Sequence, residues 1–465
     1  MNFKDTVAAV STPRGKGGVA LIRISGDEAI PIAEKAFLPK NGKRLCEIEN
    51  AKATYGTIVG RDACGETVDI DDGIATIFRA PHSFTGEDTV EITCHGGILV
   101  TAEVLEAILA AGARPAEAGE FTRRAFLSGK LGLSQAEALG ALLDADTHAK
   151  LRLSRSGLSG KVETTTRAFY DALCHILSNL YAIIDYPDED LGSLSSAEVR
   201  SSLSDIEKKI QDLAASYKSG RAILEGISTV LCGKPNVGKS SLYNRMVGRD
   251  AAIVTEVAGT TRDLLEATIP FGGVTLRLCD TAGMHDVADD VVESIGVERA
   301  KKKLQEAELV LSVFDGSKPL DDEDEALLVL IDTLSAKKLA ILNKSDKASL
   351  ADPSHIEGHF DRVITTSAKT EAGLDTLAAT VNEWFLDGTL DMAHDPVVST
   401  ARQYASLCRA TEALKNAIAS IDAGLCEDLY AADVETAMQA LSELDGREVS
   451  EDIVSGIFSH FCVGK

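Results

Sequence analysis

The stretch Gly233-Lys234-Pro235-Asn236-Val237-Gly238-Lys239-Ser240 has the spacing G-x-x-x-x-G-K-S and decides the fold of the central part of the chain. An apolar run, 227–232, precedes it, and a helix-like stretch, 241–246, follows it. A strand, a glycine loop and a helix in this order are typical of a phosphate-binding loop, in which backbone N–H groups and the helix dipole hold phosphate oxygens. We expect Lys239 to reach the β- and γ-phosphates and the Ser240 hydroxyl to bind Mg²⁺. The alternative is an ordinary glycine turn between a strand and a helix.

Two segments downstream of this loop fit the switch regions of a nucleotide hydrolase. The stretch 255–263 carries the adjacent threonines Thr260 and Thr261, and the hydroxyl of Thr261 is expected to close on Mg²⁺ and the γ-phosphate. A predicted hairpin over 266–279 then leads to Asp280-Thr281-Ala282-Gly283. We expect the Asp280 carboxylate to act on Mg²⁺ largely through water, and the Gly283 N–H to contact the γ-phosphate.

The segment after the predicted buried strand 338–342 indicates which base is bound. It carries the pattern N-K-x-D, in which the Asp346 carboxylate can accept both the N1–H and the N2–H₂ of guanine, a pair that adenine lacks. Asn343 and Lys344 are expected to brace the loops around the base, and the backbone of 367–369 to recognise the guanine oxygen. Four motifs in this order predict a Ras-like P-loop GTPase. The expected GTP-binding residues are Asn236, Val237, Gly238, Lys239, Ser240, Ser241, Thr255, Glu256, Val257, Ala258, Gly259, Thr260, Thr261, Asp280, Thr281, Ala282, Gly283, Asn343, Lys344, Asp346, Ser367, Ala368 and Lys369.

Composition limits the other functions that the chain can have. Its 465 residues are enough for roughly two to four domains. The nine cysteines are unpatterned and the N-terminus lacks a signal pattern, so we expect reduced thiols, a cytoplasmic location and no membrane segment. The net charge of −25 makes the chain a poor nucleic-acid binder by itself, because phosphate contacts need clusters of lysine and arginine. If RNA is involved, a basic partner or a locally basic groove has to help.

Residues 1–125 show the strands and helices of a mixed α/β domain. Strands are expected over 7–10, 19–24, 54–59, 74–78 and 89–94, and helices over 27–37 and 98–110. A period of two places Arg23 and Glu91 on the strand face opposite their apolar neighbours, where they either line a pocket or are two solvated strand charges. His95, in the turn after its strand, points to no particular chemistry by itself.

The rest of the chain is predicted to form a discontinuous all-α domain with the nucleotide domain inserted in it. The expected division is a first helical part at 126–220, the nucleotide domain at 221–388 and a second helical part at 389–465. A long helical pattern runs over 139–185, and Ser134 with Glu137 has the spacing of a capping box at a helix start. Further helices are expected over 195–219, 396–423 and 428–444.

Both flanking parts carry further motifs, at 21–26, 83–88, 95–97, 119–122, 124–127 and 461–465. With these motifs, the chain resembles the MnmE family (also called TrmE) of tRNA-modification GTPases over essentially its whole length. The GTPase motifs alone would fit several families, whereas their combination with both flanking parts is specific to this one.

The resemblance implies partners and a second ligand. It implies a homodimer through the N-terminal domains and a complex with the flavoprotein MnmG (GidA), on which FAD and NADH are expected. The complex would modify C5 of the wobble uridine in certain tRNAs with a carboxymethylaminomethyl or aminomethyl group. The N-terminal domain would bind 5-formyltetrahydrofolate, or a related folate that carries a one-carbon unit, in a pocket lined by Arg23, Glu91, Lys130 and Lys465. Cys462 matches a terminal cysteine linked to the modification activity, without an assigned role.

The resemblance also implies that K⁺ replaces an arginine finger in GTP hydrolysis. Ras-type enzymes carry a water-positioning glutamine after D-x-x-G, where this chain has Met284. The positions that match the K⁺ ligands of the family are Asn236, Thr255, Val257 and Thr260. Glu293 matches the water-orienting glutamate of the family, although one extra residue separates it from Gly283, and a plain surface charge is the alternative. The expected catalytic residues are Glu293, Lys239 and, through the modification activity, Cys462.

A second class of function stays open at this point: a GTP-dependent ribosome-assembly factor that works as a binding switch. Such proteins share the GTPase motifs but normally carry an RNA-binding module with a basic surface. The sequence shows no such module, and both flanking parts fit a tRNA-modification GTPase.

Overall fold

The computed structural model describes most of the chain, namely residues 5–13, 15–62, 64–185, 194–250, 266–280, 303–388, 390–391, 394–447 and 449–465. The chain packs as two compact units, one made of Met1–Gly140 with Leu441–Lys465 and the other of Ala141–Ala440. The end of the chain therefore folds with its beginning. None of the helices within the ranges just given has the length and apolar character needed to cross a membrane. The finer predicted division, at residues 125, 220 and 388, stays a prediction.

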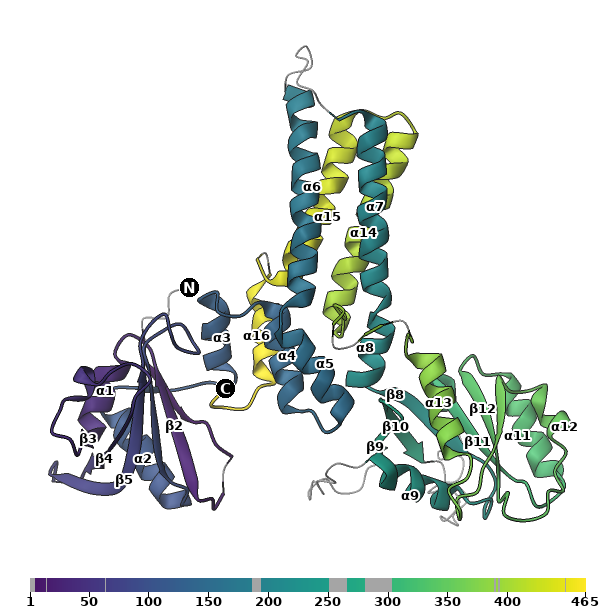
Figure 1. The fold of residues 1–465 in the computed structure, drawn as a ribbon, viewed down its shortest axis with the longest axis horizontal. Coiled ribbons are helices and arrows are strands. Elements are labelled where there is room, and N and C mark those ends of the chain that lie inside the picture. Colours follow the sequence, from purple (N-terminus) through teal and green to yellow (C-terminus); the bar gives the residue numbers. More distant parts are fainter. Residues whose placement is uncertain are drawn as a thin grey trace, which may run out of the picture. The chain divides into compact units, whose positions relative to one another are not determined.

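A seven-stranded sheet in the order β3-β4-β5-β6-β2-β1-β7 forms the N-terminal part of the first unit (Figure 1). Its elements are β1 (Val7–Val10), β2 (Val19–Ser25), α1 (Ala29–Ala36), β3 (Phe37–Pro39), the 3-10 turn η1 (Leu45–Glu47), β4 (Ala53–Arg61), β5 (Thr67–Phe78), β6 (Thr89–His95), α2 (Ile98–Ala110) and β7 (Arg114–Pro115). Helices α1 and α2 pack on one face, with Ile22 and Ile92 in the core between helices and sheet. Because side chains alternate along a strand, Arg23 and Glu91 lie on the opposite face.

Three helices complete the first unit, namely α3 (Glu120–Leu127), α4 (Leu133–Leu143) and α16 (Glu451–Ser459). Leu133, Val454 and Phe458 form a small buried core at their contact. The rings of Phe126 and Phe458 lie 6.2 Å apart, which is a favourable distance for an aromatic pair. This packing brings the last helix of the chain against α3, which follows the sheet.

The second unit contains a group of helices, which are α5 (His148–Leu158), α6 (Lys161–Asp185), α7 (Ser196–Ala215), α8 (Tyr217–Leu224), α14 (Ala401–Asp422) and α15 (Glu427–Asp445). Helices α7 and α14 pack along each other, and Arg200 of α7 donates from its Nη2 to the Asp422 Oδ2 of α14 at 2.9 Å. The predicted pairing of helices from the two sides of the nucleotide domain is therefore present.

Two local predictions are wrong in these helices. The pattern over 139–185 belongs to three helices, because Thr147 caps the start of α5 and Gly160, with φ of 72°, ends it before α6 begins. Ser134 does not cap a helix, because α4 begins one residue earlier and the Ser134 Oγ donates to the Leu444 carbonyl oxygen at 3.2 Å. The buried hydroxyl instead ties α4 to the last residues of α15, from Leu441 on, which belong to the first unit.

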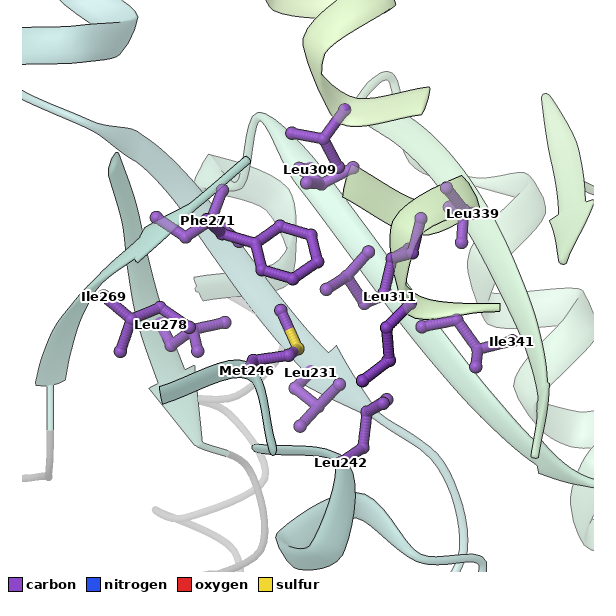
Figure 2. Packing of buried hydrophobic residues seen from close by; sticks show 14 of the residues in the cluster. Leu231, Leu242, Met246, Ile269, Phe271, Leu278, Leu309, Leu311, Leu339 and Ile341 are labelled. Atoms are coloured by element: carbon purple, nitrogen blue, oxygen red, sulfur yellow. The ribbon is translucent and has the colours of Figure 1, made fainter. Parts of the chain in front are cut away.

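A six-stranded sheet in the order β13-β12-β11-β8-β10-β9 forms the nucleotide part of the second unit. Its elements are β8 (Ile227–Cys232), α9 (Lys239–Asp250), β9 (Glu266–Phe271), β10 (Val274–Asp280), β11 (Leu309–Asp315), α11 (Asp322–Asp332), β12 (Lys337–Asn343), α12 (Pro353–Glu357), β13 (Arg362–Thr365) and α13 (Leu374–Phe385). Strands β8 and β10 to β13 are parallel, as predicted for the buried strands, and β9 forms the predicted hairpin with β10. Figure 2 shows Leu231, Met246 and Leu311 in the core between this sheet and α9. The predicted fold class is confirmed, and ligand sites of such sheets lie at the carboxyl ends of the parallel strands.

Candidate functional site

The phosphate-binding loop connects β8 to α9, and its two glycines hold conformations that other residues rarely adopt. Gly233 and Gly238 have φ of 137° and 102°. A Cβ on Gly233 would lie 2.3 Å from the Val313 carbonyl oxygen, and a Cβ on Gly238 would lie 2.2 Å from the Asn343 Nδ2. The loop is therefore packed directly against β11 and the end of β12.

Lys239, the first residue of α9, folds back over its own loop. Its Nζ donates to the Gly233 carbonyl oxygen at 2.7 Å and to the Lys234 carbonyl oxygen at 2.8 Å, and the residue is buried. The ammonium group and the N-terminal end of α9 therefore combine their positive charge at one place. Ser240 and Ser241 follow as exposed residues in the first turn of the helix.

Asn343, at the end of β12, ties the phosphate-binding loop to the loop predicted to hold the base. Its Nδ2 donates to the Val237 carbonyl oxygen at 2.8 Å, and its Oδ1 accepts the Ala368 N–H at 3.0 Å. The residue is 2% exposed. Only an amide side chain offers a donor and an acceptor in this geometry, so the asparagine satisfies a carbonyl and an N–H at once.

Lys344 makes a second link from the N-K-x-D segment to the phosphate-binding loop. Its Nζ donates to the Asn236 carbonyl oxygen at 2.8 Å and pairs with the Asp315 carboxylate at 2.7 Å. Burial would raise the pKa of Asp315, but hydrogen bonds from Lys344 and Ser317 outweigh it and lower this pKa to about 2. The carboxylate therefore stays ionised and holds Lys344 in place. Asn236 itself has φ of 64°, a left-handed backbone conformation that residues other than glycine adopt uncommonly.

The predicted guanine-recognition residues lie together beside this link. The Ser367 Oγ donates to the Asp346 Oδ1 at 2.8 Å, and this hydrogen bond lowers the pKa of the Asp346 carboxyl. Arg245 of α9 donates from its Nε to the Ala368 carbonyl oxygen at 3.1 Å, and Lys369 is exposed next to it. An ionised carboxylate only accepts hydrogen bonds, as the two N–H groups of guanine require.

The remaining predicted residues of the nucleotide site lie outside the described residues. They are Thr255, Glu256, Val257, Ala258, Gly259, Thr260, Thr261, Thr281, Ala282, Gly283, Met284 and Glu293. The backbone of Asp280 is described: it ends β10 and lies opposite Leu231 of β8. The structure therefore brings together the phosphate-binding loop, the N-K-x-D segment, residues 367–369 and the strand that leads to D-x-x-G.

A second candidate site lies on the face of the N-terminal sheet that α1 and α2 do not cover. Arg23 of β2 and Glu91 of β6 are direct neighbours in the register, and the Arg23 Nε lies 2.9 Å from the Glu91 Oε1. The rings of Phe84 and Phe121 lie 5.4 and 5.5 Å from the guanidinium. The two charges therefore pair with each other between aromatic rings and are not separate solvated strand charges.

The C-terminal tail reaches this second site through backbone contacts. The Phe121 N–H donates to a backbone oxygen of Lys465 at 3.2 Å, and the Ser11 Oγ donates to the Gly464 carbonyl oxygen at 2.9 Å. A Cβ on Gly464 would lie 2.3 Å from the Val10 carbonyl oxygen, so a glycine is needed for this approach. The tail therefore brings Lys465 to the residue whose ring flanks the Arg23 guanidinium.

The other N-terminal candidates lie on the loops around this sheet face. Cys462 is exposed, and its carbonyl oxygen accepts the Gly119 N–H at 3.5 Å. The Lys130 Nζ donates to the Pro81 carbonyl oxygen at 2.9 Å, in the loop that also carries Phe84. No group of three or more potential metal-binding side chains of His, Cys, Asp or Glu occurs within the ranges given above.

A buried cluster of ion pairs beside this site did not follow from sequence reasoning. The fully buried Arg124 side chain pairs with Glu120 at 2.9 Å, Asp5 at 2.8 Å and Glu87 at 3.2 Å. Arg114 holds Glu120 from the other side at 2.7 Å. Burial would raise the pKa values of Asp5 and Glu120, but the arginine contacts outweigh it and lower both. The spacing of Glu120 and Arg124, four residues apart on α3, is the signal that could have indicated the pair.

The comparisons with known proteins identify the family. The family described as GTP-binding protein TrmE N-terminus matches residues 6–130, and the MnmE helical domain matches residues 133–462. The tRNA modification GTPase MnmE of Lacticaseibacillus paracasei is 38% identical over 99% of this chain and 98% of its own length. The chain belongs to the MnmE family of tRNA modification GTPases. The MnmE proteins of Geobacillus kaustophilus and Acetivibrio thermocellus are also 38% identical, over 99% and 100% of both chains respectively.

A solved structure of Era from Aquifex aeolicus, bound to GDP·AlF4⁻, is 28% identical and covers 40% of this chain and 65% of that chain, with a TM-score of 0.28. A TM-score this low does not bear on the fold, which rests on the sheet order and the phosphate-binding loop described above. The predicted membership of the MnmE family is confirmed by the full-length relatives.

Replacing Arg124 with methionine tests whether the ion cluster stabilises the first unit. Removing one partner of a buried ion pair costs about 3–5 kcal/mol, because the remaining charges stay buried without a partner. We expect Arg124→Met to lose this much free energy of unfolding in urea, followed by hydrogen exchange of β1 and β2. The matched control is Arg44→Met, which removes an exposed pair with Glu34. An equal loss in both variants would contradict the role of the cluster.

The same cluster predicts the direction of the pH dependence. The pKa values of Asp5 and Glu120 lie below their ordinary values of 3.8 and 4.5 in the folded chain. Their stabilising contribution is therefore present above the ordinary values and is lost as the pH falls through the lowered ones. The free energy of unfolding should fall on acidification from pH 4.5, and this fall should be shallower in Arg124→Met. Parallel curves for the two proteins would argue against the cluster.

Proposed function

We propose that this member of the MnmE family is a K⁺-activated GTP hydrolase that modifies C5 of the wobble uridine in tRNA together with a flavoprotein partner. Its full-length relatives are tRNA modification GTPases. The observation that carries the proposal is the Asn343 bridge, which joins the phosphate-binding loop to a loop suited to guanine. The bridge supports a single site that takes phosphates at the start of α9 and a guanine beside Asp346.

In the proposed mechanism, residues of this chain bind the phosphates and direct water to the γ-phosphate. Lys239 and the N–H groups at the start of α9 contact the β- and γ-phosphates. Ser240, exposed in the first turn of α9, would hold Mg²⁺ with Thr261, and Asp280 would act through water. These hydroxyl and carboxylate oxygens suit Mg²⁺, which neutralises phosphate charge when bound. Glu293 would orient the water for in-line displacement of GDP.

Asn236 is suited to act as a K⁺ ligand. Its backbone conformation is left-handed, Lys344 fixes its carbonyl oxygen, and its side chain is exposed in the loop that binds phosphates. The other proposed ligands are Thr255, Val257 and Thr260. When bound, K⁺ would supply beside the phosphates the positive charge that an arginine finger supplies in other GTPases.

Turnover of GTP in KCl and in NaCl of equal ionic strength tests the proposed ion. We expect hydrolysis to be about 10–100-fold faster in KCl, because a positive charge next to the transferred phosphate stabilises the transition state. Asn236→Ala should lose this advantage, whereas Asn179→Ala, a change on the exposed side of α6, should keep it. Equal rates of the native chain in both salts would contradict the proposal.

The N-terminal site is proposed to bind 5-formyltetrahydrofolate or a related one-carbon folate. The Glu91 carboxylate offers an acceptor to the N–H edge of a pterin, and the rings beside Arg23 offer apolar surface to it. Lys130 and Lys465 would pair with the glutamate tail of the folate. The backbone contacts of the tail support this assignment for Lys465, because they bring it to the same sheet face.

Folate binding to the full-length chain, measured by calorimetry, tests this assignment. Glu91→Gln should weaken binding about tenfold or more, because it removes a charged acceptor from a partly buried hydrogen bond. Glu49→Gln, which removes the same charge from an exposed pair with Lys52, is the matched control and should bind folate like the native chain. Equal affinities of the two variants would rule out Glu91 as a folate ligand.

The remaining parts of the proposal concern the partners and Cys462. We infer a homodimer through the N-terminal domains and a cytoplasmic complex with MnmG, which would carry FAD and use NADH. Because the chain has a net charge of −25, we infer that the partner protein supplies most of the contacts to tRNA phosphates. Cys462 is exposed on a tail that backbone contacts hold against the N-terminal unit, which fits a part in the modification chemistry.

A further inference from the structure

Lys234, the first variable residue of the phosphate-binding loop, is held by the start of helix α11. Its Nζ lies 2.7 Å from the Asp324 Oδ2 and also donates to the Asp321 carboxylate. The side chains of Lys234 and Asp324 are only 19% and 6% exposed. Burial would lower the pKa of Lys234, but the two carboxylates outweigh it and raise this pKa. The Lys234 ammonium group is therefore kept charged, and the contact is largely shielded from solvent.

Asp324 is itself fixed by the capping box of α11. The Asp321 Oδ1 accepts the Asp324 N–H at 3.3 Å, and the Asp324 Oδ2 accepts the Asp321 N–H at 3.2 Å. These reciprocal bonds fasten both side chains to the first turn of the helix. The carboxylate that meets Lys234 therefore belongs to a rigid element.

The backbone of Lys234 holds the phosphate-binding lysine at the same time. The carbonyl oxygens of Gly233 and Lys234 accept the Lys239 Nζ at 2.7 and 2.8 Å. The side chain of Lys234 thus contacts the start of α11, and its carbonyl oxygen contacts Lys239. The spacing G-x-x-x-x-G-K-S does not call for such a contact, because it leaves this position open.

We propose that Asp324, acting through Lys234, is a positioning residue for Lys239 in GTP binding and hydrolysis. The inference rests on the GTP hydrolase function proposed above. The ion pair restricts rotation of the peptide groups at 233 and 234, so their carbonyl oxygens stay turned toward the Lys239 ammonium. The loop is then ordered before the nucleotide arrives, and less of the binding free energy is used to order it. Asp324 needs no contact with the nucleotide in this role.

The competing role for Lys234 is direct attraction of the nucleotide phosphates. In that role the Asp324 carboxylate would draw the cation away, and removing its charge would tighten GTP binding. The positioning role predicts weaker binding after the same substitution. The two roles therefore differ in the sign of the effect.

The test is steady-state GTP hydrolysis, together with GDP affinity, for the full-length chain carrying Asp324→Asn, Lys234→Met or both. Asparagine keeps an oxygen for the Asp321 N–H, so the capping box is retained while the charge is removed. Each single variant should raise the KM for GTP and the Kd for GDP about tenfold, since a misplaced loop weakens phosphate contacts. The double variant should have a KM for GTP and a Kd for GDP no higher than those of the single variant that binds less tightly, because both changes remove the same contact. Lys234→Arg keeps the ion pair and should bind nearly as tightly as the native chain.

The matched control is Glu383→Gln, which removes the same charge from an exposed pair with Arg362 in the same part of the chain. It should leave KM and Kd unchanged. Partial unfolding alone would lower kcat at unchanged KM, and that pattern in both single variants would overturn the proposal. Additive effects, or tighter GDP binding by Asp324→Asn, would also overturn it. A native chain that fails to hydrolyse GTP would instead refute the proposed function.

Discussion

The two hydrogen bonds of the buried Asn343 amide hold the phosphate side and the base side of the nucleotide site at one spacing. The bridged loops follow β8 and β13, and Asn343 itself ends β12. Strand β11 lies between β8 and β12 in the sheet, so no direct strand pairing aligns the two loops. Gly238 leaves room for the amide and for no side chain of its own, so the loop conformation and the bridge depend on each other. Lys344 repeats the link at Asn236, and Lys234 anchors the start of the same loop.

The N-terminal unit also depends on contacts between distant segments. Its sheet provides the Arg23–Glu91 pair, and the tail at Gly464 and Lys465 completes the same face from the other end of the chain. The buried Arg124 cluster fixes α3, the helix that carries the backbone N–H to which the tail bonds. A folate at this face would therefore lie where the two ends of the chain meet, beside the segment with the exposed cysteine.

Features with a local cause could be predicted from the sequence, and features that join distant segments could not. The glycine spacing predicted the strand, loop and helix around 233–240, and a period of two placed Arg23 and Glu91 on one sheet face. No local pattern indicates that Lys234 contacts Asp324 or that Arg124 also pairs with Asp5 and Glu87, because these contacts arise only when separate elements pack. The breaks within 139–185 were missed for a related reason, since apolar periodicity continues across a capped helix start. The switch residues and Glu293 stay predictions.

GTP hydrolysis at this site is proposed to drive modification of the wobble uridine. The most direct measurement is the nucleoside composition of tRNA from a strain that lacks this chain and is complemented with the native protein or with Lys239→Ala. We expect the modified uridine to disappear in the deletion strain, to return with the native chain and to stay absent with Lys239→Ala, because the phosphate contact is lost. Normally modified tRNA in the deletion strain, together with a defect in ribosome assembly, would contradict the account.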